Sequence, residues 1–274
     1  MPKGISVNIG LNAVDSHHYV DEDGKPWPGT LAACENDARD MAALADAQGF
    51  EVRGPLLTTA ATTDAVTRAL TKAADELRAG DMLFLTYSGH GGQVDNVNPE
   101  IDDEDDQLDE TWCLYDRELI DDELFALFAR FQAGVRVLVL SDSCHSGTVT
   151  RAAPQPVVDA DAAPKNLPPN VALATEAAHR DVYAAVQRAV PVEGLTTMAA
   201  TVVLISGCQD HQTSRDGRKN GAFTGALLQA WKDPNARKSL KRLWKTTAAL
   251  IPASYDQEPN FSVYGFDASP AITL

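Results

Sequence analysis

With 274 residues, 44% of them apolar, the chain is long enough to form one large α/β domain with a sizeable core. Its formal net charge of −16 disfavours nucleic acid and anionic membranes as partners, and no run of about 20 apolar residues predicts a membrane span. The four cysteines lack CxxC spacing and the first ten residues lack an apolar signal region, so we expect a cytoplasmic protein without a disulfide scaffold or a structural zinc site.

Apolar, β-branched runs alternate with helical patterns along the chain. Continuous apolar strands separated by helices predict a mostly parallel sheet covered on both faces, with functional groups beyond the carboxyl ends of its strands. In chain order, the expected elements are a strand over 4–12, a helix over 35–49 closed by Gly49, a short strand over 50–57, a helix over 62–80 with Thr63 as N-cap and Gly80 at its end, a strand over 81–89, a helix over 121–134, strands over 135–143 and 201–209, helices over 221–232 and 238–250, and a last strand over 260–266.

Two segments interrupt this alternation. Residues 95–110 contain "EIDDEDDQLDE" and are expected to form an acidic loop. Residues 150–170 are rich in Pro and Ala, and we interpret the stretch from about 150 to 195 as a linker or a long insertion.

Three strand ends carry residues capable of chemistry. The first reads "YSGHGG" and contains His90, the second reads "SDSCHSG" and contains Cys144, and the third reads "SGCQDHQTS" and contains Asp210. A thiol is a nucleophile only as its thiolate, and a histidine on a neighbouring strand end can accept its proton. Each residue taken alone could have a purely structural role, because HG is common in glycine turns and a cysteine at a strand end is often a buried apolar residue.

Backbone groups beside these residues can also contribute. The N–H groups of Gly91 and Cys144 are candidates to stabilise a developing oxyanion, for which small residues leave room. His145 competes with His90 as the base, but it is adjacent to Cys144 in sequence and its side chain should diverge from the thiol.

"YSGHG" followed about 50 residues later by "DSCHSG" resembles the caspase-like cysteine peptidases, specifically the metacaspases and their prokaryotic relatives, the orthocaspases. The resemblance extends from "ACEND" at 33–37 to "GCQDHQTS" at 207–214. It implies a caspase-type three-layer α/β/α sandwich in a single peptidase domain over 1–274, with His90 as general base and Cys144 as nucleophile.

Acidic residues surround the predicted dyad, and a pocket lined by carboxylates favours a cation. The alternative is that each Asp caps a helix, which Asp37 is well placed to do. The resemblance implies that Asp37, Asp142, Cys34 and Ser88 line the pocket for the residue before the cut, with Asp210 nearby on the third strand end. It therefore implies protein substrates cleaved after Arg or Lys.

The acidic loop has two interpretations: a solvated run of charge, or a site for Ca²⁺, which collects carboxylate oxygens. The resemblance implies that Asp105, Asp121 and Asp122 are the calcium ligands. Where the family often has a further acidic residue after "CHSG", this chain reads "TVTR", so the sequence leaves open whether the enzyme needs no cofactor or uses calcium.

Three functions follow from these residues. The first is a cysteine endopeptidase, which we expect to act in a bacterial stress or defence cascade and to be switched on by a partner protein. The second is a non-catalytic caspase-like regulatory or scaffold module, which the intact His–Cys pair argues against. The third is a metal hydrolase that uses His90, Cys144, His145 and His17 or His18, a spacing that matches no usual zinc pattern.

The 150–195 stretch contains four basic residues that such a peptidase could recognise, namely Arg151, Lys165, Arg180 and Arg188. A segment tethered close to Cys144 has a high effective concentration at the active site. We therefore predict that this stretch either blocks the substrate groove or is cut by it, and the alternative is an insertion that stays whole.

Overall fold

The computed structural model describes residues 2–97, 108–144, 163–190, 198–209 and 212–265. In these residues seven strands form one main sheet, in the order β10-β9-β8-β4-β1-β2 with β3 also paired to β1. All pairings are parallel except that between β9 and β10, so the mostly parallel sheet expected from the sequence is confirmed. The strands are β1 (Gly4–Gly10), β2 (Glu51–Val52), β3 (Leu56–Leu57), β4 (Met82–Ser88), β8 (Arg136–Asp142), β9 (Thr201–Ser206) and β10 (Asn260–Tyr264).

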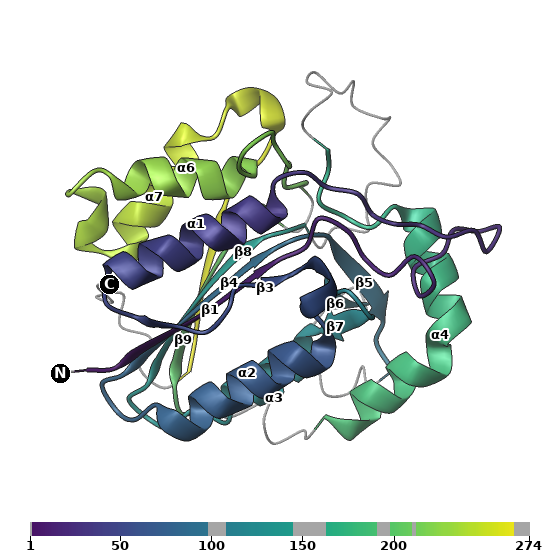
Figure 1. Ribbon diagram of the computed structural model, residues 1–274, viewed down its shortest axis with the longest axis horizontal. Helices are drawn as coiled ribbons and strands as arrows, with labels where there is room; N and C mark the ends of the chain where they lie inside the picture. The colour runs from purple at the N-terminus through teal and green to yellow at the C-terminus, as the bar shows by residue number, and fades with distance from the viewer. Residues whose placement is uncertain (1, 98–107, 145–162, 191–197, 210–211, 266–274) are drawn as a thin grey trace.

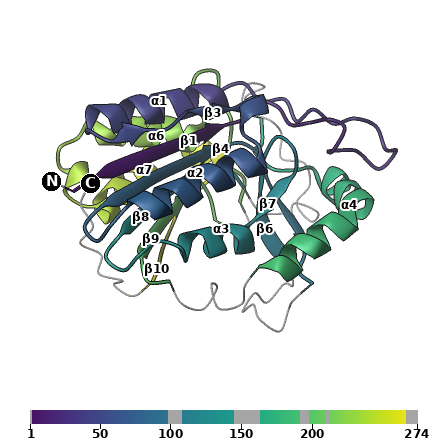
Figure 2. The same ribbon diagram turned by 60° about the horizontal axis from the view of Figure 1, so that its bottom comes forward.

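Helices cover both faces of this sheet, which gives the three-layer sandwich (Figures 1 and 2). One face carries α1 (Cys34–Ala47), α6 (Ala222–Trp231) and α7 (Leu240–Leu250), and the other carries α2 (Thr63–Glu76) and α3 (Asp121–Phe128). Short 3₁₀ turns occur at Thr58–Ala60, Ala236–Lys238 and Ala253–Tyr255. No helix in the described ranges combines the length and the apolar character that crossing a membrane requires.

The alternation of side chains along β4 decides which face each residue serves. Leu83 and Leu85 pack in the core with α2 and α3, whereas Met82 and Phe84 pack with α1, α6 and α7. By the same alternation Ser88, the last residue of β4, points toward the face covered by α1 and α6.

A second, three-stranded sheet follows β4 directly and lies at one end of the sandwich (Figure 1). It consists of β5 (Gly91–Asp95), β6 (Leu108–Cys113) and β7 (Glu118–Ile120), all antiparallel, with α4 (Pro169–Ala189) packed against β5. The expected acidic loop thus begins and ends in strands, and its residues 98–107 lie outside the described part. The expected linker is not irregular throughout, because it contains a 21-residue helix.

Two predicted helix signals were wrong. The N-cap of α2 is Thr62, whose side chain accepts a hydrogen bond from the N–H of Ala65, while Thr63 donates its hydroxyl to Asp116 instead. Helix α2 ends at Glu76 rather than at Gly80. Gly80 has a φ of +92° and serves the turn into β4, where its N–H donates to the carbonyl of Gly134.

Candidate active site

Ser88 and Asp142 are register partners at the carboxyl ends of β4 and β8. Partners in a parallel ladder point to the same face, so both side chains lie toward α1 and α6. His90 and Cys144 each follow two residues later, which brings the two predicted strand ends to the same edge of the sheet.

The imidazole of His90 is fixed in one tautomer by its hydrogen bond. Its Nε2 lies 3.0 Å from the carbonyl oxygen of Gly29, which can only accept, so Nε2 carries the hydrogen. Nδ1 is buried and has no hydrogen-bond partner among the described residues. Burial lowers the pKa of His90 to about 4, although the backbone of Gly29 and of Asn166 acts in the opposite direction. The ring is therefore neutral near pH 7, with a basic lone pair on Nδ1.

Cys144 is buried and lies two residues beyond the end of β8. Its backbone N–H donates to the carbonyl oxygen of Lys165 at 3.1 Å, and the N–H of Gly91 donates to the same oxygen at 3.1 Å. The thiol of Cys144 hydrogen-bonds the carbonyl oxygen of Gln212. The two N–H groups expected to hold an oxyanion thus converge on one peptide carbonyl of the chain itself.

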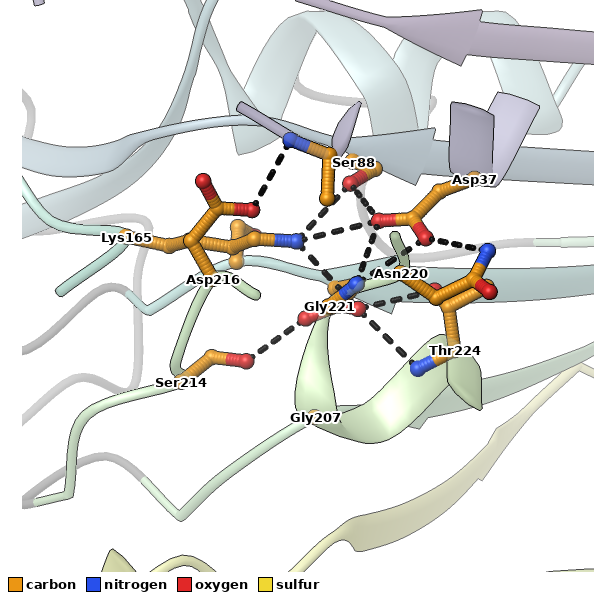
Figure 3. Close-up of polar contacts among 12 residues, drawn as sticks. Asp37, Ser88, Lys165, Gly207, Ser214, Asp216, Asn220, Gly221 and Thr224 are labelled. Carbon is orange, nitrogen blue, oxygen red and sulfur yellow. Dashed lines mark hydrogen bonds and ion pairs between the residues drawn. The ribbon is translucent and has the colours of Figure 1, made fainter. Parts of the chain in front are cut away.

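The side chain of Lys165 enters an acidic pocket and is completely buried there (Figure 3). Its Nζ lies 3.2 Å from Oδ2 of Asp37, 3.3 Å from Oδ2 of Asp142 and 2.9 Å from Oγ of Ser88. Burial alone would lower the pKa of Lys165, but Asp142, Cys34, Asp37 and Asp216 together outweigh it and raise that pKa well above its ordinary value. The ammonium ion is charged and paired.

The start of helix α6 holds the two carboxylates of this pocket in place (Figure 3). The N–H of Gly221 donates to Asp37 at 3.0 Å, and the N–H and hydroxyl of Thr224 donate to Oδ2 of Asp142 at 3.0 and 2.8 Å. Free N–H groups at a helix N-terminus stabilise negative charge. Burial, with help from Asp142, still raises the pKa of Asp37, while Lys165 opposes that rise. The pocket therefore needs a cation to compensate its charge.

The backbone from Ala163 to Lys165 is bound as an added strand. The N–H of Lys165 donates to the carbonyl of Ser214 at 2.9 Å, and the N–H of Asp216 donates to the carbonyl of Ala163 at 2.8 Å. Pro164 forms an antiparallel bridge with Arg215 between these two bonds. An extended peptide is thus held by main-chain hydrogen bonds and by one side-chain pocket, a common mode of peptide recognition.

Comparisons with known proteins show the family to which the chain belongs. The family model for the caspase domain matches residues 17–266. The chain belongs to the caspase domain family. Its sequence is 30% identical to metacaspase-1 of Saccharomyces cerevisiae over 299 residues, which cover 93% of this chain and 65% of that protein. It is 29% identical to metacaspase-1 of Kluyveromyces lactis, covering 85% of this chain and 62% of that one. The chain therefore spans less than two thirds of the length of these relatives.

Solved structures also resemble this caspase domain. Protein GSU0716 from Geobacter sulfurreducens has 46% sequence identity and a TM-score of 0.85, with 100% of this chain and 97% of that chain covered. Caspase-1 from Spodoptera frugiperda has a TM-score of 0.53 at 10% identity, with 96% and 86% covered, and shows that the fold is shared. The caspase-type sandwich predicted from the sequence is confirmed.

The remaining predicted pocket residues are placed as follows. Cys34 is buried at the start of α1, where burial raises the pKa of its thiol to about 12 and Ser88 and Lys165 are neighbours. Asp37 does not cap α1, because that helix begins at Cys34 and the Asp37 carboxylate accepts from Gly221 and Ser88. Asp210 and His145 lie outside the described residues.

The calcium site expected in this caspase domain is incomplete in what the structure describes. Asp121 and Asp122 begin α3, and the N–H of Asp122 donates to Oδ1 of Asp121 at 2.9 Å. Asp105 lies outside the described residues, and the described ranges contain no group of three or more His, Cys, Asp or Glu side chains suited to a metal ion. The two aspartates alone do not fit a calcium ion, which takes six to eight oxygen ligands.

Sequence reasoning missed the groups that support the pocket, namely Ser214, Asn220, Gly221 and Thr224. Ser214 donates to Oδ1 of Asp142 at 2.6 Å, and Asn220 donates to Oδ1 of Asp37 at 3.1 Å. A signal was present, since "NGAFT" places a turn dipeptide directly before a helix. Nothing local in that signal indicates which residues far away in sequence would receive the hydrogen bonds.

Proposed function

We propose that this caspase domain is a cysteine endopeptidase that hydrolyses peptide bonds after Lys or Arg. One observation carries the proposal. The carbonyl oxygen of Lys165 accepts hydrogen bonds from Gly91 and Cys144 while its ammonium group occupies the pocket of Asp37 and Asp142. A substrate bound in the same way would present its own scissile carbonyl to Cys144.

The chemistry needs only the two residues of the dyad. Nδ1 of His90 accepts the thiol proton of Cys144, and the sulfur attacks the carbonyl carbon while the N–H groups of Gly91 and Cys144 stabilise the oxyanion. The C–N bond breaks, the amine leaves with the proton from His90, and a thioester remains on Cys144. Water, deprotonated by His90, then hydrolyses the thioester to a carboxylate and regenerates the thiol.

The pocket favours both basic side chains for electrostatic reasons. Two carboxylates and the hydroxyl of Ser88 surround the bound ammonium, and the planar guanidinium of Arg can hydrogen-bond two carboxylates at once. An acidic side chain there would add a third negative charge to a buried site that holds two, which is strongly unfavourable.

Fluorogenic peptide reporters that end in Arg, Lys or Asp test the proposal. We expect hydrolysis of the Arg and Lys reporters, none of the Asp reporter, and complete loss of hydrolysis in Cys144→Ala and after iodoacetamide. No thiol-dependent hydrolysis of any reporter, by protein with a native circular dichroism spectrum, would instead favour a regulatory module. Hydrolysis that zinc chelators abolish and iodoacetamide spares would favour a metal hydrolase.

A further inference from the structure

We propose that a cavity on the side of the main sheet away from the acidic pocket binds a small apolar amine, such as a phenylalkylamine. The cavity is bounded by β6, α3, β8 and β9, with Tyr264 of β10 beside them. Figure 2 shows α3 between these strands of the main sheet and the second sheet. This binding site is additional to the proposed function and does not depend on it.

The alternation of side chains along β8 separates the cavity from the acidic pocket. Asp142 points toward α1 and α6 and lies beside the ammonium group of Lys165. Ser141, its neighbour in the chain, points the other way and lines the cavity, as does Val139. The thickness of the sheet therefore lies between the two sites, and each can be altered without the other.

The cavity has the size and the lining of a site for a small molecule. Its volume is about 270 Å³, and an apolar cavity of about 150 Å³ is already large enough to bind benzene. Trp112, Phe128 and Val139 form a buried, apolar floor. Tyr264 is exposed, so a ligand can enter from solvent beside its ring. One aromatic ring with a short alkyl chain fits this space.

The walls of the cavity are held in place by contacts behind them. The ring of Trp112 stacks on that of Tyr87 at 4.4 Å, and the Tyr87 hydroxyl donates to the carbonyl oxygen of His90 at 2.6 Å. On the opposite wall, Oγ of Ser141 lies 2.8 Å from Oγ of Ser143. Binding to a site that is already formed avoids the free-energy cost of ordering its side chains.

The charged groups of the cavity favour a cation over an anion. Glu110 and Asp121 are the charged side chains among the described residues that line it, and no Lys, Arg or His is among them. Both are half-buried, so they lie where the cavity meets solvent, and Glu110 shares a face of β6 with Trp112. An ammonium group can hydrogen-bond these carboxylates while its apolar body covers the aromatic floor. A carboxylate in the same place would be repelled.

Three probes with the same apolar body and different charge test this preference, namely 4-phenylbutylamine, 4-phenylbutanol and 4-phenylbutyrate. Binding to the full chain carrying Cys144→Ala is measured by titration calorimetry near neutral pH, with EDTA present so that no metal ion competes for Asp121. We expect the amine to bind about tenfold more tightly than the alcohol, because hydrogen bonds to charged groups are stronger than neutral ones. The acid should not bind.

Three further substitutions in the same protein locate the bound amine. Glu110→Gln should remove the preference for the amine over the alcohol, whereas the exposed control Glu258→Gln should keep it. Leu204→Trp, which adds a ring from β9 into the cavity, should abolish binding of both probes in protein with a native circular dichroism spectrum. Asp142→Asn alters only the acidic pocket and should leave the affinity for the amine unchanged.

Each opposite result would overturn the proposal. Equal affinity for the amine and the acid, or a preference that survives Glu110→Gln, would show that the carboxylates of the cavity do not select the ligand. Binding that Asp142→Asn abolishes would place the amine in the acidic pocket instead. No binding of any probe would show that the cavity does not accept ligands of this class.

Discussion

The N–H and hydroxyl of Thr224 both donate to the same oxygen of Asp142 that lies 3.3 Å from the ammonium group of Lys165. One carboxylate oxygen thus connects the start of α6 to the bound basic side chain. Because Asp142 ends the strand that leads to Cys144, recognition of the cation and position of the thiol depend on the same short stretch of chain.

Asp142→Asn should reduce kcat/KM for Arg and Lys reporters by at least about 30-fold. Removing one partner of a buried, hydrogen-bonded charge pair costs about 2 kcal/mol or more, which corresponds to that factor. Asp46→Asn, an exposed substitution on α1, is the control and should leave turnover unchanged. Equal turnover by the two variants would show that Asp142 does not bind the basic side chain.

Gly221→Ala should abolish cleavage after basic residues without unfolding the protein. A Cβ at this position would meet both Nζ of Lys165 and Oδ2 of Asp142, so the methyl group takes the space of the cation. Gly225→Ala, inside the helix that Gly221 precedes, is the matched control, because its Cβ would meet nothing closer than 3.5 Å. We expect the control to keep wild-type kcat/KM, and its thermal midpoint should rise because alanine favours a helix interior.

Gly29→Ala should lower kcat and leave KM unchanged. Gly29 has a φ of +53°, and its Cβ would press on the Trp27 ring and come within 3.2 Å of Cδ2 of His90, so the base shifts while the acidic pocket is untouched. Gly24→Ala controls for backbone strain, since Gly24 also has a positive φ of +71° but no atom within 4 Å of its Cβ. A similar fall in kcat for both variants would assign the effect to strain alone.

Glu118→Gln should make the stability of the fold less dependent on pH. Burial raises the pKa of Glu118 from 4.5 to about 7, so between these values the folded chain holds a proton that the unfolded chain has lost. This group therefore lowers the free energy of unfolding as pH rises from 4.5 to 7, by roughly 3 kcal/mol in total.

Urea unfolding of the Cys144→Ala protein at pH 5 and pH 8 measures this effect in an uncut chain. Adding Glu118→Gln should shrink the loss of stability between the two pH values, whereas adding the exposed substitution Glu258→Gln should not. An unchanged difference would mean that Glu118 is already ionised in the folded protein.

The sequence was sufficient to predict the strands of the main sheet and the positions of His90 and Cys144 just beyond two neighbouring strand ends, because both depend on local patterns. Apolar runs indicate buried parallel strands, and such strands bring their carboxyl ends to one edge. Helix α4 was not predicted, since its pattern is weak: Leu173 and Val182 are among the exposed large apolar side chains. The Pro- and Ala-rich composition before it also favoured a linker.

The occupant of the pocket could not be singled out from the sequence. Lys165 was one of four basic residues in the 150–195 stretch, and no local feature distinguishes it from Arg180 or Arg188. Lys165 is distinguished only by contacts with residues far away in the sequence. Its ammonium group lies close to Asp37 and Asp142, and the preceding residue, Pro164, forms a bridge with Arg215. The hydrogen bonds on either side of this bridge are made by Lys165 and Ala163. Pro164, which has no N–H group to donate, is therefore tolerated between them.

β8 and β9 are parallel neighbours in the main sheet, yet the chain between them includes α4, which packs against β5 of the second sheet. The two strands can pair only after this long connection has closed, and such long-range parallel pairing is slow. We therefore expect the edge of β8 that faces β9 to stay unpaired until late in folding. During that time the edge is open to pairing with strands of other chains, which favours aggregation during folding.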